Sequence, residues 1–129
     1  ENAALLADAL SSHSNISRVL YPSRADHPDI SAAKTLLGVN GCNIVSIELC
    51  HQTRAAANRF VENAREIAFA PTLGDVGTTL SHPASSSHRS LSVSEREKLG
   101  ISEGFFRISV GIEEPEALIQ VFSKAASSI

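Results

Sequence analysis

The sequence predicts an α+β domain, an α/β layer in which a small, mainly antiparallel sheet of about four strands carries helices on one face. Two segments, 43–49 and 105–110, alternate apolar and polar residues as half-buried strands do. Segments 3–10, 53–65 and 115–125 instead have the composition or apolar spacing of helices. Because such helices need a sheet face to cover, we expect the face that carries Arg107 to remain poorly covered.

Nine elements are expected along the chain, alternating between helix and strand. Asn2 is available to cap the first helix, and Gly38 is suited to end the second. Pro115 is well placed for the first turn of the last helix. The expected segments are a helix at 3–10, a strand at 16–21, a helix at 31–37, a strand at 43–49, a helix at 53–65, a strand at 67–69, a helix from 94, a strand at 105–110 and a helix from 115.

Residues 70–93 form a long stretch without periodic apolar residues. They are rich in Ser, Thr, Gly, Pro and His. An irregular stretch of this length inside a domain is usually functional or disordered, and we expect residues 74–93 to be mobile in the isolated domain. Ser94, with Glu97 three residues later, matches a capping box, so the next helix is expected to begin there and end at Gly100.

Length, composition and charge restrict the class of protein. The 129 residues fit one domain, 1–129. A content of 43% hydrophobic and 19% charged residues is typical of a globular protein. No apolar run approaches the length of a membrane span, and a net charge of −3 with scattered basic residues does not suit a nucleic-acid-binding surface. Neither a membrane nor a nucleic acid is therefore expected as a partner.

The cysteines and histidines suggest neither a disulfide nor a metal site. Cys42 and Cys50 are expected in one strand, where their separation spans about 27 Å, beyond the reach of a disulfide. Free thiols favour a reducing, cytoplasmic location. The five histidines lack the spacing of metal ligands. The chain has no methionine and starts at Glu1, which we interpret as a fragment boundary.

Two polar motifs do not match known catalytic or phosphate-binding patterns. The serines at 85–87 are not inside a Gly-x-Ser-x-Gly elbow, so a hydrolase nucleophile is not predicted. Leu73-Gly74-Asp75 lacks the glycine spacing and the lysine of a phosphate-binding loop. The residues alone indicate a polar loop and a turn.

Arg107 has two possible roles. It lies in the middle of a predicted strand, between Phe106 and Ile108. Its side chain can face solvent on the open side of the sheet. It can also serve as an anion receptor, because a guanidinium fits a carboxylate with two hydrogen bonds. Composition alone leaves both readings open.

Several motifs, in matching order and spacing, resemble one enzyme family. They are Thr72-Leu73-Gly74-Asp75, Ser81-His82-Pro83-Ala84-Ser85 with His88, the segment 95–102, and the segment 107–113. Leu20-Tyr21-Pro22, followed by His27-Pro28, fits the same pattern upstream. Together they resemble the carboxy-terminal domain of the cysteine/methionine-metabolism family of fold-type I pyridoxal-phosphate (PLP) enzymes. That family includes methionine γ-lyase, O-acylhomoserine sulfhydrylase, cystathionine γ-synthase and cystathionine γ-lyase.

The resemblance implies a substrate-binding site in this chain. It implies that Arg107 binds the α-carboxylate of the substrate and that Thr72 lies beside the same carboxylate and the cofactor. The residues expected to support this site are Leu73, Gly74, Asp75 and Gly77.

The resemblance also implies that the chain contains no catalytic residue of its own. The Schiff-base lysine would lie in a larger, preceding PLP-binding domain that is absent from this chain. Lys34, Lys98 and Lys124 do not match the motif around that lysine. We therefore expect this fragment to bind no PLP and to be inactive alone, while the full-length enzyme uses PLP. The implied partners are the protein's own N-terminal PLP domain and a sulfur amino-acid substrate. The resemblance also implies a homo-oligomer, a tetramer, for the full-length protein.

Departures from the family pattern bear on the substrate. Ser23 replaces a glycine of the family, and Ser85-Ser86-Ser87-His88 departs from its common Ser-Met-Thr-His. Gly77 stands where members that act on cystathionine commonly carry Glu, so we expect γ-elimination or γ-replacement on a methionine-like or O-acylhomoserine substrate. The alternative is a non-catalytic, stand-alone or degenerate domain that acts as an interaction module.

Overall fold

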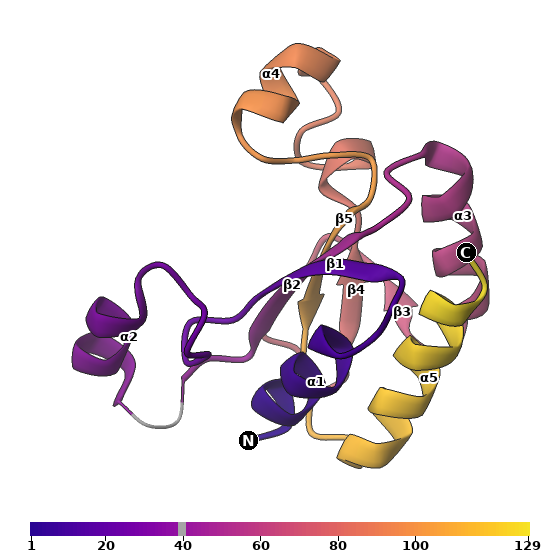
Figure 1. Cartoon of the computed structure of the whole chain (residues 1–129). Coiled ribbons are helices and arrows are strands. Elements are labelled where there is room, and N and C mark those ends of the chain that lie inside the picture. The colour runs from indigo at the N-terminus through magenta and orange to yellow at the C-terminus, as the bar shows by residue number, and fades with distance from the viewer. Residues whose placement is uncertain (39–40) are drawn as a thin grey trace.

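The computed structural model describes residues 1–38 and 41–129 as a five-stranded sheet packed against helices (Figure 1). The strands are β1 (Ile16–Leu20), β2 (Ile44–Leu49), β3 (Ala68–Phe69), β4 (Thr79–Ser81) and β5 (Phe105–Ser109). The helices are α1 (Asn2–Ser11), α2 (Ile30–Leu37), α3 (Arg54–Asn63), α4 (Val93–Lys98) and α5 (Pro115–Ser127), with a short 3-10 helix η2 (Pro83–Ser85). The strand order is β1-β2-β5-β4-β3, and every neighbouring pair is antiparallel except β3 with β4. The α+β fold with a mainly antiparallel sheet is thus confirmed.

The two segments with the clearest alternation, now β2 and β5, pair with each other in the sheet. Val45, Ile47 and Leu49 are buried, whereas the residues between them are only half-buried. In β5, Phe106 and Ile108 are fully buried on the same side of the sheet. The period of two therefore identified both the strands and their core-facing sides.

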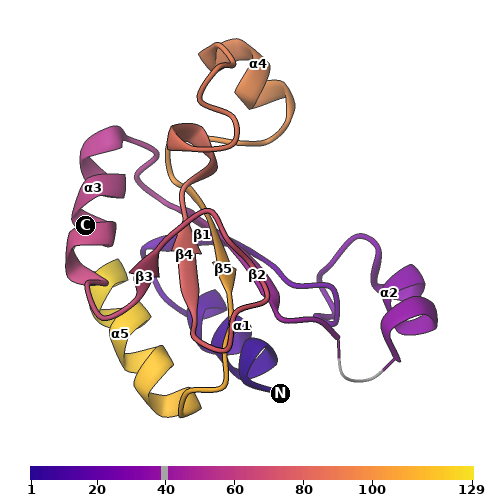
Figure 2. The same cartoon turned by 180° about the vertical axis from the view of Figure 1, so that it is seen from behind.

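The core lies between the sheet and a layer formed by α1, α3 and α5. Phe60 of α3 packs its ring against Phe106 of β5, with centroids 4.9 Å apart, and against Phe122 of α5 at 6.3 Å. Leu6 and Leu10 of α1 belong to the same buried cluster. Figures 1 and 2 show α3 and α5 side by side from opposite directions. Their apolar stripes remove the core face of the sheet from water.

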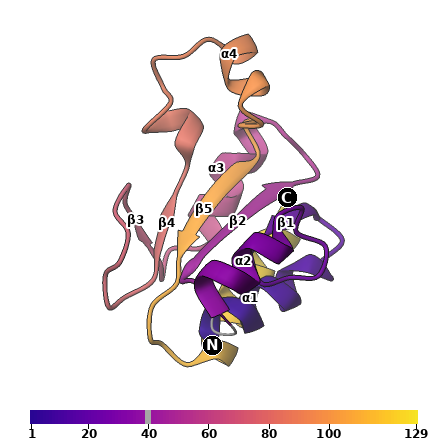
Figure 3. The ribbon, with the colours of Figure 1, turned by 90° about the vertical axis from the view of Figure 1, so that its left-hand side faces the viewer.

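The other face of the central strands has little cover. Ile44, Ser46, Phe105 and Arg107 are half-buried there. Figure 3 looks onto β4 and β5 with no helix in front of them and α3 behind. Helices α2 and α4 project away from the sheet and its helical layer (Figure 1). The described helices leave the Arg107 face open, as expected, although Ser109 and Ser81 on this face are buried.

The sheet has five strands where about four were expected, because β4 was missed. Its residues lie inside the segment 70–93, which was interpreted as irregular. Residues 78–84 are buried, and Leu80 contributes to the core from β4. A three-residue strand is too short for its alternation to be recognised among serines and threonines. The mobility of residues 74–93 stays a prediction, but the premise of few anchors is wrong for 78–84.

Three local assignments are also corrected. The capping box uses Ser92 and Glu95, two residues earlier than predicted, because the Ser92 side chain accepts from the Glu95 amide. Asn2 lies inside α1 and its side chain makes no cap hydrogen bond; the amide instead donates to carbonyls at 111 and 113. Cys42 and Cys50 flank β2 rather than lying within it, and both are free.

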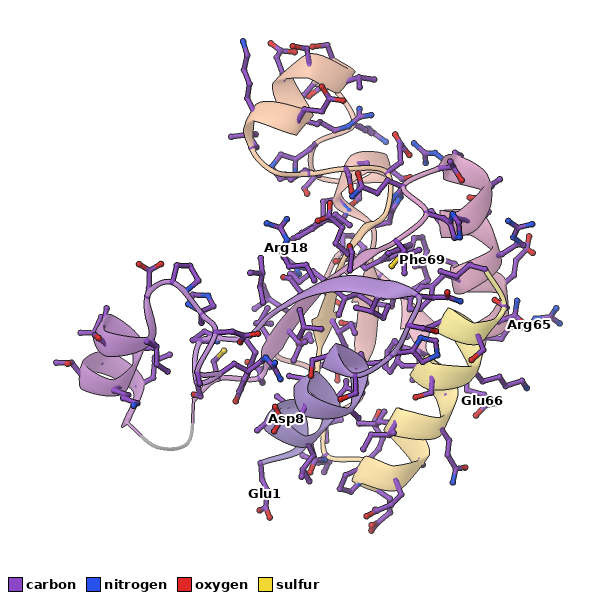
Figure 4. The ribbon with its side chains drawn as sticks, viewed as in Figure 1. Glu1, Asp8, Arg18, Arg65, Glu66 and Phe69 are labelled. Carbon is purple, nitrogen blue, oxygen red and sulfur yellow. The ribbon has the colours of Figure 1, made fainter. Side chains whose placement is uncertain are left out.

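Charged side chains lie around the periphery. Figure 4 shows Glu1 and Arg65 pointing outward from the lower and right-hand edges. Ion pairs join Arg18 to Glu48 at 3.1 Å and Arg24 to Asp8 at 2.6 Å. Among the described residues, no helix has the length and apolar character needed to span a membrane, and no cluster of His, Cys, Asp and Glu could hold a metal ion.

Candidate functional site

Arg107 lies at the middle of β5, on the uncovered face of the sheet. Its backbone pairs with Ser46 of β2 on one side and Ser81 of β4 on the other. Phe105 and Ser109 share its face, while the apolar residues between them point into the core. Because β5 is an interior strand, both neighbouring strands hold the Arg107 backbone, so the backbone that carries this side chain is rigid.

The guanidinium of Arg107 is only partly satisfied by the protein. Nη2 donates to the carbonyls of Pro71 at 3.3 Å and Thr72 at 3.2 Å. Nε is buried and has no hydrogen-bond partner among the described residues. No carboxylate within the described ranges forms an ion pair with Arg107. A buried, unpaired donor on a cation is costly, and an incoming carboxylate would satisfy it.

Thr72 lies beside Arg107, and the contact between them runs through the Thr72 backbone. The Thr72 carbonyl accepts from Arg107 and from the Thr79 hydroxyl at 3.2 Å. The Thr72 residue itself is exposed. The structure thus brings the two predicted binding residues together, and the loop that starts at Pro71 borders the guanidinium.

The other four predicted residues continue this loop. Leu73 is 61% exposed, and Asp75 is exposed with its Oδ1 accepting from the next amide at 2.7 Å. Gly74 adopts a φ of 77°, in the left-handed region that favours glycine. No hydrogen bond joins Leu73, Gly74, Asp75 or Gly77 directly to Arg107 within the described part of the chain. These four residues form the loop that borders Arg107.

A hydrogen-bonded clasp holds the far end of the loop. Glu113 accepts from the Thr78 amide at 2.6 Å and from the Thr78 hydroxyl at 2.7 Å. That hydroxyl in turn accepts from the Gly111 amide at 2.9 Å. The Asn2 side chain donates to the Glu113 carbonyl at 2.6 Å. Burial pushes the pKa of Glu113 upward, but the two hydrogen bonds from Thr78 outweigh it and leave the pKa below its ordinary value.

Ser109 is the residue near Arg107 that sequence analysis overlooked. Ser109 is 1% exposed, and its hydroxyl accepts from the Gly74 amide at 3.0 Å and from the Asn43 side chain at 3.3 Å. The signal was present, because the period of two already placed Ser109 on the face of Arg107. The clasp through Glu113 and Asn2 joins residues about 35 and 111 positions apart, and no local pattern reveals such pairs.

A second polar cluster lies at the opposite end of β5. His82, 3% exposed, stacks near Phe106 with ring centroids 4.8 Å apart. Its Nε2 donates to the Glu103 carbonyl at 2.9 Å, so Nδ1 accepts from the Ser85 hydroxyl at 2.6 Å. Burial lowers the pKa of His82, the Glu103 carbonyl partly offsets this, and the Arg54 cation lowers it further. The imidazole is locked between two partners, which suits a structural role.

The lysines of the chain do not lie at the Arg107 site. Lys34, Lys98 and Lys124 are exposed on α2, α4 and α5, outside the strands and the 71–78 loop. The uncovered face offers a cation for a carboxylate, but no amine that could attach PLP. The residues present fit an amino-acid carboxylate and do not fit a covalently held PLP.

Comparison with known proteins identifies the relatives. The family model described as "Cys/Met metabolism PLP-dependent enzyme" matches residues 1–127. The chain belongs to this family. A cystathionine beta-lyase of Bacillus subtilis is 37% identical over 129 residues, covering 100% of this chain and 32% of the relative. An L-methionine gamma-lyase of Fusobacterium nucleatum is 34% identical over 119 residues, covering 92% of this chain and 30% of the relative.

The solved structures agree with the fold. Cystathionine gamma synthase of Xanthomonas oryzae, in complex with cystathionine, superposes with a TM-score of 0.86 and 34% identity, covering 98% of this chain and 32% of that one. The chain thus spans about a third of the length of the relatives that it matches. The relatives include enzymes named for cystathionine and for methionine, so this similarity does not distinguish the substrates.

Proposed function

We propose that this chain is the carboxy-terminal, substrate-binding domain of a PLP-dependent enzyme of sulfur amino-acid metabolism. The supporting observation is the guanidinium of Arg107, which lies on the uncovered face without a carboxylate partner among the described residues. Its planar donors match the α-carboxylate of an amino acid. The proposed reaction is γ-elimination or γ-replacement on a methionine-like or O-acylhomoserine substrate.

The proposed role of this domain is to bind and orient the substrate. Arg107 would hold the carboxylate, and the Pro71 and Thr72 carbonyls would keep Nη2 in place while the other donors turn to the ligand. Thr72 would border the same carboxylate. When bound in such an enzyme, PLP supplies an electron sink for the bonds around the amino-acid carbon.

The remaining components are proposed to lie outside this chain. The attachment lysine would belong to the protein's own N-terminal PLP domain, and the working enzyme would be a cytoplasmic homotetramer. The exposed positions of Lys34, Lys98 and Lys124 support the prediction that this chain alone is inactive. Mixing the isolated chain with PLP and recording its absorption spectrum tests this point. A stoichiometric lysine adduct that disappears when one of these lysines is replaced would contradict it.

Substitution of Arg107 in the full-length enzyme tests the function itself. Removing one partner of a buried, hydrogen-bonded charge pair costs about 2–5 kcal/mol, so Arg107→Ala is expected to lower kcat/KM roughly thirtyfold to a few thousandfold. Arg107→Lys should restore only part, because an ammonium cannot make two parallel hydrogen bonds. Arg65→Ala, at an exposed position, is the matched control.

Substrate variants separate the proposal from its rival. A substrate whose α-carboxylate is esterified should react poorly with the natural enzyme, and Arg107→Ala should reduce this discrimination. A solvent-facing arginine in an interaction module predicts an effect under about 0.5 kcal/mol for either substitution. Unchanged kcat/KM and unchanged preference for the free carboxylate in Arg107→Ala would remove the site assignment.

A further inference from the structure

The loop from Pro71 to Thr78 is attached to β5 at two residues of the same strand face. Arg107 reaches the loop through the Pro71 and Thr72 carbonyls. Ser109, two residues further along β5, reaches it through the Gly74 amide at 3.0 Å. Since alternate residues of a strand share a face, both side chains meet the loop from the same side.

The hydroxyl of Ser109 suits this place better than any apolar group. Ser109 is 1% exposed, and its hydroxyl accepts two hydrogen bonds, from the Gly74 amide and the Asn43 side chain. Gly74 has a φ of 77°, so the turn depends on a conformation that most residues avoid. The hydrogen bond from the Gly74 amide is partly shielded from solvent, and the buried Ser109 hydroxyl supplies its acceptor.

We propose that Ser109 is a positioning residue for the substrate carboxylate, acting through the 71–74 loop on Arg107. This inference rests on the proposed function of Arg107 as the carboxylate receptor. Ser109 fixes the turn at Gly74, the turn fixes the carbonyls of Pro71 and Thr72, and these carbonyls orient Nη2 of Arg107. Asn43 assists by donating to the same hydroxyl from the residue before β2.

The test compares Ser109→Ala, Ser109→Cys and the control Ser17→Ala in the full-length enzyme. Ser17 lies exposed on the edge strand β1 and donates to the Glu48 carbonyl, away from the loop. Ser109→Ala should lower kcat/KM roughly tenfold, mainly through a higher KM, because a positioning contact serves bound substrate and transition state alike. Ser109→Cys keeps an acceptor at the same position, although sulfur is larger and accepts more weakly, and should show a smaller loss of the same kind.

A double-mutant cycle distinguishes positioning from plain stabilisation. If Ser109 acts through Arg107, Ser109→Ala should change kcat/KM little when Arg107 is already alanine. Hydrogen exchange gives a second readout: amides in 72–78 should exchange faster in both Ser109 variants, whereas Ser17→Ala should leave them unchanged.

The possible outcomes separate the two hypotheses. A normal KM in both Ser109 variants, or the same loss with and without Arg107, overturns the role of Ser109 while leaving the Arg107 site intact. No effect of Arg107→Ala by itself removes the proposed function on which the inference depends. A KM increase that disappears in the Arg107→Ala background, together with faster exchange in 72–78, supports the inference.

Discussion

At the amino end of β5, Glu103 forms ion pairs with two arginines, Arg54 and Arg96, each at 2.8 Å. At the carboxyl end, Glu113 is bound by the amide and hydroxyl of Thr78. Both ends hold parts of the segment 71–85 against the same strand. The cations at the amino end form ion pairs within the protein, whereas Arg107 between the two ends forms none with the described carboxylates. The ion-paired arginines hold the fold here, and Arg107 is the cation that we propose to bind a ligand.

The largest loss of stability is expected from Glu103→Gln. Arg96 is only 10% exposed at its side chain, and Glu103 is 23% exposed. Removing the carboxylate leaves the Arg96 cation without its partner, which should cost about 2–3 kcal/mol after allowing for solvent at Glu103. Urea denaturation of the 129-residue chain measures this loss. The exposed Glu97→Gln on α4 is the matched control, and equal midpoints for the two variants would contradict the pairing.

The next largest loss of stability is expected from Gly111→Ala, beyond the carboxyl end of β5. A Cβ at Gly111 would meet the Val76 carbonyl, with the Glu113 carboxylate at 2.6 Å and the Gly77 carbonyl carbon at 2.7 Å. Overpacking against backbone should cost about 1–3 kcal/mol. At Gly77 an added Cβ would meet only the Glu113 carboxylate at 3.8 Å, so Gly77→Ala should cost under about 0.5 kcal/mol. Thermal unfolding of both variants tests the difference, and equal losses would show that the clasp is not tight.

The regular elements could be predicted because their signals are local. The alternation at 43–49 and 105–110 located β2, β5 and the face of Arg107. The predictions that failed concern residues whose partners lie far away in the sequence. Asn2 is a plausible cap by composition, but its amide serves carbonyls more than a hundred residues away. β4 is three residues long and becomes a strand only through pairing with β5 and β3.

The candidate site shows the same difference between residues with a local sequence signal and residues that depend on distant partners. Arg107 and Thr72 were predicted from motifs, and the structure brings them into contact. Ser109, Asn43 and Glu113 were not predicted, because serine, asparagine and glutamate have many ordinary structural uses. Ser109 and Glu113 accept hydrogen bonds from the loop, and Asn43 donates to Ser109. These bonds form between segments that no periodicity connects.

A smaller, pH-dependent effect is expected at the amino end through His82. Burial lowers its pKa in the folded chain, so the unfolded chain binds its proton more readily. The stability due to neutral His82 should be complete above about pH 6.5 and should decline as the pH falls, by at most about 1.4 kcal/mol per pH unit. Urea midpoints measured from pH 7 down to pH 5 should show this slope, and His82→Gln should remove it. An unchanged slope in that variant would assign the titration to another group.

The smallest effect is expected at the carboxyl end, where Glu113 responds to a lower pH range. Hydrogen bonds from Thr78 hold the folded-state pKa below its ordinary value, so the charged carboxylate stabilises the fold above about pH 4.5. That contribution should be lost as the pH falls through the lowered pKa. Glu113→Gln keeps the shape of the clasp without the titration, so its stability should fall less steeply below pH 4.5 than that of the natural chain. Hydrogen exchange at the Thr78 amide should accelerate over the same range only in the natural chain. If both chains lose protection together, the acid response belongs to the domain as a whole, and the two ends of β5 do not differ in pH dependence.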